Sequence, residues 1–275
     1  MAGGPILVSG ATGLLGGRLS AALQRDGLAV RALTRDPEGA RRRCSPEIQL
    51  MGWDGVHPPP EALAGARAVV HLAGAPVFAG PLTRSRRRRI YASRIDSTRA
   101  IAAALEATPG AERPAVLVCA SAVGFYGSRG EEPLDETSPA GRGFFADLCG
   151  AWEAAALAAE ACGVRTVCLR IGIVLAREGG ALRLMARVFR LGLGGRLGNG
   201  EQWFPWVHAD DVAALIRRAV SDAALRGPVN AVAPVPVRNK QLTRALAAAL
   251  GRPALLPVPA FALRAGLGEL SEELL

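Results

Sequence analysis

The sequence predicts an α/β protein: a doubly wound parallel sheet with helices on both faces and a smaller C-terminal cap domain. Short apolar runs rich in Val, Ile and Leu alternate with Ala- and Leu-rich segments of helical period, which is the order that builds such a sheet. After Val174 this alternation gives way to Gly- and Pro-rich stretches at 191–206 and 232–239, which indicate excursions into a cap. The length of 275 residues accommodates both units.

Strands and helices alternate along the first part of the chain. Each predicted strand is a short, mostly apolar run, and each predicted helix repeats its apolar residues at helical spacing. The predicted strands are residues 5–9, 29–34, 68–73, 115–121, 166–171 and 229–232, and the predicted helices are residues 14–25, 83–107, 144–162 and 210–223. With right-handed crossovers, residues 1–175 and 206–233 form the sheet domain, and residues 176–205 and 234–275 form the cap.

The composition excludes several classes of protein. Hydrophobic residues make up 50% and charged residues 21%, which is too apolar for a disordered chain. No apolar run reaches the roughly 18 residues of a membrane helix, and no basic stretch precedes residues 6–8 as in a secretory signal. The five cysteines include no C-x-x-C pair. We therefore expect a soluble, cytoplasmic protein with reduced thiols, no membrane partner and no metal site.

The net charge of +9 comes almost wholly from arginine, because Lys240 is the only lysine. A basic balance favours nucleic acid in principle. The two arginine blocks at 41–43 and 86–89 have no interleaved aromatic residues, however, and no recognition motif accompanies them. We interpret them as solvated helix faces and expect no nucleic-acid partner. A nucleic-acid-binding protein, whose affinity for nucleic acid would fall steeply as the salt concentration rises, remains an alternative hypothesis.

The strongest motif is the segment ILVSGATGLLGGRLSAAL near the N-terminus, in which an apolar strand leads into three spaced glycines and a helix. Gly10 permits a tight turn, Gly13 lets the backbone approach a pyrophosphate, and Gly16 lets the helix pack closely on the sheet. The spacing is G-x-x-G-x-x-G rather than the commoner G-x-G-x-x-G, and a plain tight turn is the alternative. Because the motif opens the chain as its first strand-to-helix turn, it predicts a Rossmann-type dinucleotide site.

The end of the second strand distinguishes between the two nicotinamide cofactors. An NAD site places Asp or Glu there for the ribose hydroxyls, whereas this strand ends with Thr34 and Arg35. A guanidinium donates charge-assisted hydrogen bonds to a 2′-phosphate, which a carboxylate would repel. Asp36 is the counter-argument, since a small change of register would bring its carboxylate forward, and a solvated loop cation is the alternative for Arg35. The sequence favours NADP over NAD.

Several segments resemble the extended short-chain dehydrogenase/reductases, and among them the atypical, epimerase-like proteins that carry a small C-terminal domain of unknown function. The matching segments are GATGLLG, VVHLAGAPV, SRIDSTR, ASAVGFYG, WEAAALAAE, LRIGIVLAREGGAL, FRLGLGGRLGNGEQWFPWVHADDVA and GPVNAVAPVPVRN. They cover nearly the whole chain. The resemblance implies an NADP-binding Rossmann-type domain and a cap truncated at its C-terminal end, because family members generally continue through a further helix and strand.

The resemblance also implies a set of cofactor-binding residues. The glycine loop holds the phosphates, and the end of the second strand holds the adenosine side. The implied residues are Gly10, Thr12, Gly13, Leu14, Leu15, Gly16, Thr34, Arg35, Leu72, Ala73, Arg94 and Val174.

The usual catalytic pair of this superfamily, Tyr-x-x-x-Lys on one helix, is missing from the sequence. In that pair the lysine charge lets the tyrosine exchange a proton near neutral pH, while a serine polarises the substrate carbonyl and the nicotinamide carries hydride. The residues four positions after the two tyrosines, Tyr91 and Tyr126, are Ile95 and Gly130. Neither tyrosine therefore has the lysine it would need.

Ser121 and Tyr126 are the predicted catalytic residues. Ser121 ends the predicted strand 115–121, at the sheet edge where doubly wound folds bind ligands. Tyr126 is the best remaining proton donor, although the sequence supplies no cation beside it, and a pocket-lining aromatic is the alternative. The family pattern places Cys149 and Glu153 where tyrosine and lysine usually stand. We interpret Cys149 as structural and Glu153 as a solvent-facing helix residue.

His208 precedes a predicted helix whose first turn holds Asp210 and Asp211. An aspartate N-cap beside a loop histidine explains this segment without any function. A role for His208 in the pocket is the alternative.

Two hypotheses on function follow from these observations. The first is an NADP(H)-binding oxidoreductase or epimerase-like enzyme that acts on a small hydroxyl or carbonyl substrate between sheet and cap. The second, motivated by the missing Tyr/Lys pair, is a catalytically silent NADP(H)-binding protein that reports redox state to a partner. A homodimer is open under both hypotheses.

Overall fold

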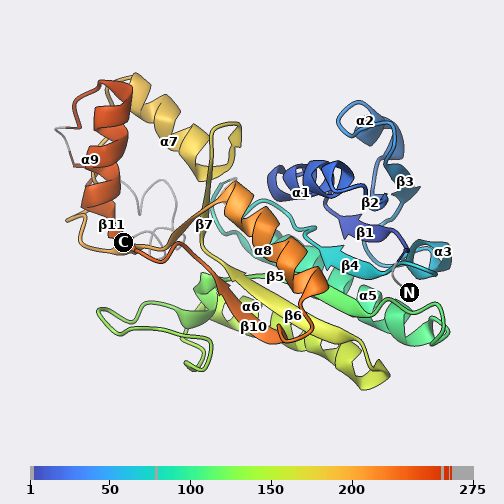
Figure 1. Ribbon diagram of the computed structural model, residues 1–275. Helices are drawn as coiled ribbons and strands as arrows, with labels where there is room; N and C mark the ends of the chain where they lie inside the picture. The colour runs from blue at the N-terminus through green and yellow to red at the C-terminus, as the bar shows by residue number, and fades with distance from the viewer. Residues whose placement is uncertain (1–2, 78–79, 255–256, 260, 262–275) are drawn as a thin grey trace.

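A seven-stranded parallel sheet forms the centre of the computed structural model, which describes residues 3–77, 80–254, 257–259 and 261 (Figure 1). The strand order is β10-β6-β5-β4-β1-β2-β3, and every neighbouring pair runs parallel. The strands are β1 (Ile6–Ser9), β2 (Val30–Thr34), β3 (Gln49–Gly52), β4 (Ala68–His71), β5 (Val116–Ala122), β6 (Arg165–Ile171) and β10 (Gly227–Ala231). This order confirms the predicted Rossmann-type, doubly wound fold.

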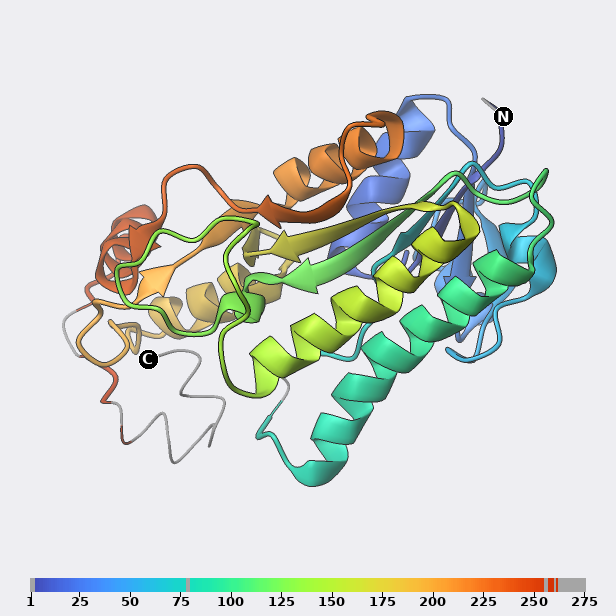
Figure 2. The ribbon, with the colours of Figure 1, turned by 90° about the horizontal axis from the view of Figure 1, so that it is seen from below.

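Helices cover both faces of the sheet. Helices α1 and α8 pack together on one face, and α5 and α6 pack together on the other (Figures 1 and 2). The helices are α1 (Leu14–Arg25), α2 (Pro37–Arg41), α3 (Pro60–Leu63), α4 (Arg84–Tyr91), α5 (Ser97–Ala107), α6 (Phe144–Leu157), α7 (Gly180–Arg190), α8 (Ala209–Ser221) and α9 (Asn239–Leu250). All of β1 and β4 is buried between these layers, which explains why their sequences are uninterrupted apolar runs rather than alternating ones.

The strand order reverses between β1 and β4, and this reversal positions the ligand site. From β1 the chain proceeds outward through β2 and β3, and it then crosses back to β4 on the other side of β1. In open α/β sheets the crevice for a ligand lies at the carboxyl ends of the strands at such a reversal. The loops after Ser9 and His71 therefore form the expected binding edge.

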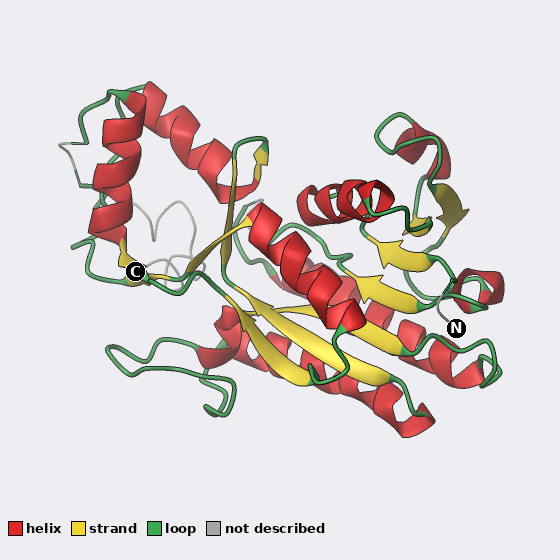
Figure 3. Cartoon of the chain, in the orientation of Figure 1, coloured by secondary structure: helices red, strands yellow, loops and turns green. Residues whose placement is uncertain are grey.

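A second, smaller cluster of elements lies beside the carboxyl edge of the sheet (Figure 3). Two short sheets join its loops: β7 (Ile173–Ala176) pairs with β9 (Trp206–His208), and β8 (Trp203–Phe204) pairs with β11 (Val237–Arg238). Phe189 of α7 packs with Leu246 of α9 in an apolar cluster separate from the main core. Residues 262–275, which the sequence assigns to the cap, lie outside the described residues.

Candidate functional site

The glycine loop between β1 and α1 has the geometry of a phosphate cradle. Gly10 has a φ of 76°, in the left-handed region that glycine adopts without strain, and the N–H of Gly13 donates to the carbonyl of Gly10 at 2.9 Å. A Cβ on Gly10 would lie 2.9 Å from the backbone of Leu72, so the loop approaches the β4 strand end closely. Gly13 caps α1 without a side chain, and the first turn of α1 holds no acidic residue. This helix end therefore presents its backbone N–H groups to an anion.

Helix α1 begins tightly against this loop. A Cβ on Gly16 would lie only 2.2 Å from the carbonyl oxygen of Gly10, so no larger residue fits there without moving the helix. Of the two leucines at the helix start, Leu15 packs on the main core. The side chain of Leu14 lies against Gly179 and Gly180 at the start of α7. The start of α7, in the segment that the sequence assigns to the cap, therefore contacts the first residue of α1 next to the glycine loop.

We expect Gly16→Ala to lower the free energy of unfolding by about 1–3 kcal/mol, because the added methyl group displaces α1 from the loop. Gly17→Ala is the matched control, since its Cβ would meet the nearest heavy atom, the carbonyl oxygen of Ala11, at an ordinary 3.5 Å. Urea unfolding of both variants checks this prediction, and equal stability of the two would contradict it.

Three buried polar side chains, Ser9, His71 and Ser97, form a chain of hydrogen bonds next to the glycine loop. The Oγ of Ser9 accepts from the N–H groups of Leu72 and Ala73 at 3.2 and 3.3 Å, so its own proton goes to Nδ1 of His71 at 2.6 Å. Nε2 of His71 then donates to Ser97 Oγ at 3.1 Å. Burial, followed by the nearby Arg94 charge, lowers the pKa of His71 to about 3. The neutral imidazole thus connects the ends of β1 and β4, which lie on the predicted cofactor edge.

His71 makes the stability of the protein dependent on pH. Its folded pKa lies below the usual value of 6.5, so the unfolded chain takes up the proton first as the pH falls. The contribution of neutral His71 to the free energy of unfolding is complete above about pH 6.5. It decreases as the pH falls and is smaller by about 2 kcal/mol at pH 5. Urea unfolding at pH 7 and pH 5 measures this loss. The loss should be smaller in His71→Asn, and an equal loss in both proteins would contradict the assignment.

The end of β2 presents an unpaired arginine. Arg35 is exposed, and within the described part of the chain its side chain has no hydrogen bond or ion pair. The neighbouring Asp36 caps α2 instead, because its Oδ1 accepts from the N–H of Gly39 at 2.9 Å. The carboxylate that could have favoured NAD is therefore engaged in a helix cap. Thr34 is the last residue of β2 and lies half-buried next to Arg35.

Arg94 and Val174, the last two residues of the predicted cofactor set, belong to elements that follow β4 and β6. Arg94 belongs to a π-helical turn (Ala92–Asp96) between α4 and α5, and its Nη1 donates to the carbonyl of Ala75 at 3.0 Å. Its guanidinium lies over the ring of Trp152, 5.2 Å from the centroid, and burial lowers its pKa. Val174 lies in β7 opposite Val207 of β9.

The predicted catalytic residues belong to one buried hydrogen-bond network across three strands. Arg170 of β6 is the register partner of both Ser121 in β5 and Asn230 in β10. Ser121 Oγ donates to Glu153 Oε1 at 2.7 Å, and Arg170 holds both oxygens of Glu153 at 2.9 Å. Arg170 Nη1 also donates to Tyr126 Oη at 2.9 Å, and Tyr126 Oη donates to Asn230 Oδ1 at 2.7 Å. We call this set the Arg170 network.

The Arg170 network corrects two expectations from the sequence. Glu153 is not solvent-facing: it is 6% exposed and forms a salt bridge with Arg170 beneath the sheet edge. Tyr126 does have a cation beside it, again Arg170. Burial alone would lower the pKa of Arg170, but its hydrogen bonds with Glu153 and Tyr126 raise it above the usual value. The available signal was an arginine inside the otherwise apolar run of β6.

Cys149 is a buried thiol beside this network. Burial, and next the charge of Glu153, raise its pKa to about 11. The thiol therefore carries its proton at neutral pH and is a poor nucleophile, which agrees with its interpretation as a structural residue.

His208 is itself the N-cap of α8, so the expectation of an aspartate cap is wrong. Its Nδ1 accepts from the N–H of Asp210 at 3.2 Å. The Asp210 carboxylate pairs instead with Arg18 of α1, which also pairs with Glu178 in the turn before α7. Arg18 thus links the turn before α7 to α1, the helix that follows the glycine loop.

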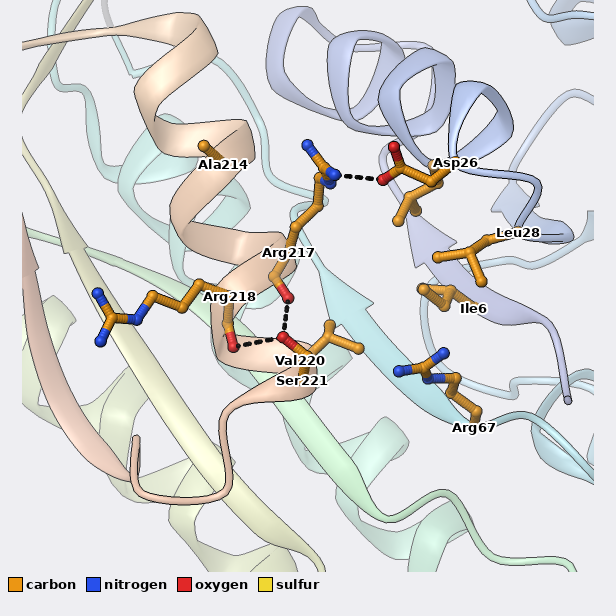
Figure 4. Close-up of a pocket in the computed structure, with 10 residues that line it drawn as sticks. Ile6, Asp26, Leu28, Arg67, Ala214, Arg217, Arg218, Val220 and Ser221 are labelled. Atoms are coloured by element: carbon orange, nitrogen blue, oxygen red, sulfur yellow. Dashed lines mark hydrogen bonds and ion pairs between the residues drawn. The ribbon is translucent and has the colours of Figure 1, made fainter. Parts of the chain in front are cut away.

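A cavity of about 410 Å³ between α1 and α8 lies at the opposite edge of the sheet, near the amino end of β1 at Ile6 (Figure 4). Arg67 and Arg217 line it, and Arg217 pairs with Asp26. Both helices end here, and arginines complement the partial negative charge of helix carboxyl ends. We therefore assign these arginines a structural role.

Within the described residues, no group of three or more His, Cys, Asp or Glu side chains is arranged to hold a metal ion. In the part of the chain that the structure describes, no helix is both long and apolar enough to cross a membrane.

Comparisons with known proteins show the family to which the chain belongs. Residues 6–231 match the NAD dependent epimerase/dehydratase family. The chain is 39% identical over 269 residues to the chloroplastic epimerase family protein SDR39U1 homolog of Arabidopsis thaliana, covering 96% of this chain and 76% of that protein. It is 37% identical to YfhF of Bacillus subtilis, covering 97% and 86%.

Among solved structures, human SDR39U1 with NADPH superposes with a TM-score of 0.84 at 31% identity, covering 98% of this chain and 87% of that one. Matches of this extent, over nearly the whole chain, establish the family rather than the fold alone. The chain belongs to the NAD dependent epimerase/dehydratase family, as an atypical extended short-chain dehydrogenase/reductase of the epimerase-like type.

Proposed function

We propose that this protein is an NADP(H)-dependent oxidoreductase or epimerase-like enzyme that acts on a small hydroxyl or carbonyl substrate. The observation that carries the cofactor choice is Arg35 at the end of β2, which is exposed and has no partner among the described residues. The neighbouring Asp36 carboxylate is engaged in a helix cap. A guanidinium in this position attracts a 2′-phosphate, whereas NAD sites usually have a free carboxylate there for the ribose hydroxyls. The human SDR39U1 structure, which is described with NADPH, supports the same choice.

The residues at the carboxyl edge fit such a dinucleotide. Gly10 and Gly16 let the loop pack closely against the end of β4 and the start of α1, where a Cβ would collide with backbone. No side chain caps the start of α1, so its N–H groups are available to a pyrophosphate. Leu72 and Ala73 follow β4 beside this loop. Arg94 and Val174 complete the proposed cofactor set on the nicotinamide side.

Tyr126 is the proposed proton donor of the reaction. Its phenolic oxygen lies 2.9 Å from Arg170 Nη1, so a fixed positive charge takes the place that a lysine has in the usual catalytic pair. The nicotinamide, when bound, supplies or accepts the hydride. Ser121 donates its proton to Glu153 and would turn from that carboxylate to polarise a substrate oxygen.

Steady-state hydride transfer across a panel of small carbonyl and hydroxyl compounds tests this function. Tyr126→Phe keeps the ring but removes the oxygen between Arg170 and Asn230, so kcat should fall about 10²- to 10⁴-fold while the Kd for NADPH is unchanged. Full activity of Tyr126→Phe, or no turnover of any compound by the native protein, would contradict an enzymatic role for this tyrosine.

A specific observation favours a second candidate, a catalytically silent protein that senses NADP(H). The hydroxyl protons of Ser121 and Tyr126 are both donated inside the protein, to Glu153 and Asn230. A sensor must bind NADPH and NADP⁺ with different affinities, because a ligand shifts a population only by its differential affinity. Calorimetric titration with both forms tests this, and equal Kd values exclude the sensor.

A further inference from the structure

We infer that Arg43 is a second arginine of the 2′-phosphate site, which makes the preference for NADP(H) depend on two cations. This inference rests on the proposed binding of NADP(H). The observation behind it is that Nη2 of Arg43 donates to the carbonyl oxygen of Thr12 at 2.6 Å. Thr12 lies in the glycine loop between β1 and α1, whereas Arg43 lies 31 residues later, between α2 and β3.

This hydrogen bond places a cation at the rim of the dinucleotide cradle. Strands β1 and β2 are neighbours in register, and the glycine loop and Arg35 follow their carboxyl ends. The segment after β2 turns through α2 and returns to this same edge, where the Arg43 side chain reaches the loop. Arg35 and Arg43 therefore both belong to the segment beside the adenosine end of the site.

The charge around Arg43 is not neutralised by the protein. Arg43 is exposed, and no carboxylate within the described residues forms an ion pair with it. Of the nearby acids, Asp36 caps α2, and Glu38 lies 4.0 Å from Arg41. One N–H group of the guanidinium donates to a neutral carbonyl oxygen, and its other N–H groups are available to a ligand. A phosphate accepts such hydrogen bonds about twice as strongly as a neutral oxygen.

The charge of the ligand matches two arginines better than one. A phosphomonoester carries between about −1.5 and −2 charges at neutral pH. Arg35 alone can neutralise only one of these charges. Arg43 can turn from Thr12 to the phosphate while staying over the glycine loop, so that the two guanidinium groups hold the phosphate from two directions. Within the described residues the side chain of the adjacent Arg42 makes no hydrogen bond or ion pair, so Arg42 provides a matched control.

Calorimetric titrations of Arg43→Ala and Arg42→Ala with NADPH, NADH and 2′,5′-ADP test the inference. In Arg43→Ala the Kd values for NADPH and 2′,5′-ADP should rise about tenfold or more, while the Kd for NADH changes less than about twofold. Arg42→Ala should leave all three within about twofold. Thermal unfolding of both variants confirms that the exposed substitutions leave the fold intact.

Each other outcome overturns the inference in a recognisable way. Equal losses for NADPH and NADH would assign Arg43 to the pyrophosphate or to the loop itself. Equal losses of NADPH affinity in the Arg43 and Arg42 variants would show that the effect comes from the change in net charge and not from a specific contact. If the native protein prefers NADPH and Arg43→Ala does not change this, only the role of Arg43 fails. If the native protein binds neither dinucleotide, the proposed function fails together with it.

Discussion

Replacing Arg35 with alanine weakens NADPH binding by about 10- to 100-fold and leaves NADH binding within about twofold. The physical reason is that a charge-assisted hydrogen bond to a phosphate contributes about 1.5–3 kcal/mol, and NADH has no phosphate at this position. Arg35 is exposed and forms no ion pair with any described residue, so its replacement removes no ion pair among them. Calorimetric titration of the native and variant proteins with both dinucleotides measures the effect.

A control separates this local effect from the general charge of the protein. Arg226 is also exposed, but it immediately precedes β10, at the amino edge of the sheet. Arg226→Ala removes the same formal charge far from the proposed site and should leave both affinities unchanged. A similar loss of NADPH affinity in the two variants, or a parallel loss for NADH in Arg35→Ala, would contradict a 2′-phosphate contact.

Replacing Arg170 with methionine lowers the free energy of unfolding by about 3–5 kcal/mol, the largest stability effect that we expect. Arg170 and Glu153 have only 4% and 7% of their side chains exposed. Replacing Arg170 leaves the buried Glu153 carboxylate without its counter-charge. The free-energy penalty of that unpaired charge is much larger than the net stabilisation that the intact pair provides. Urea unfolding followed by circular dichroism measures the change.

The double variant Arg170→Met with Glu153→Leu tests the cause of that loss. Removing both charges eliminates the unpaired carboxylate, so the double variant should be more stable than Arg170→Met alone, and the two substitutions should be clearly non-additive. A single variant within about 1 kcal/mol of the native protein would show that the Arg170 network does not stabilise the fold.

The sequence predicted the elements whose burial leaves a strong pattern. Strand β5 and helix α1 begin and end within a residue of their expected bounds, because continuous apolar runs and an amphipathic stripe identify them. Strand β3 was missed, since this edge strand is short and carries exposed Gln49 and Gly52. Helices α7 and α9 were also missed, because they lie amid Gly- and Pro-rich loops and share a small apolar cluster apart from the main core.

The site was predictable where the requirement is local and unpredictable where it depends on sheet register. Each glycine of the loop is required by a turn or by a close contact with a backbone atom. The spacing, together with its place at the first strand-to-helix turn, therefore predicted the geometry of the loop. The hydrogen bond between Tyr126 and Asn230 joins residues 104 positions apart. Arg170 meets both only because β5, β6 and β10 are adjacent and in the observed register. No local pattern encodes that alignment.

The most direct test of the account is a crystal structure of the native protein with NADPH. We predict that the pyrophosphate lies against the backbone N–H groups between Gly10 and Gly16 and that the 2′-phosphate lies within hydrogen-bonding distance of Arg35. A dinucleotide bound with its 2′-phosphate directed into solvent, away from the end of β2, would contradict the central claim.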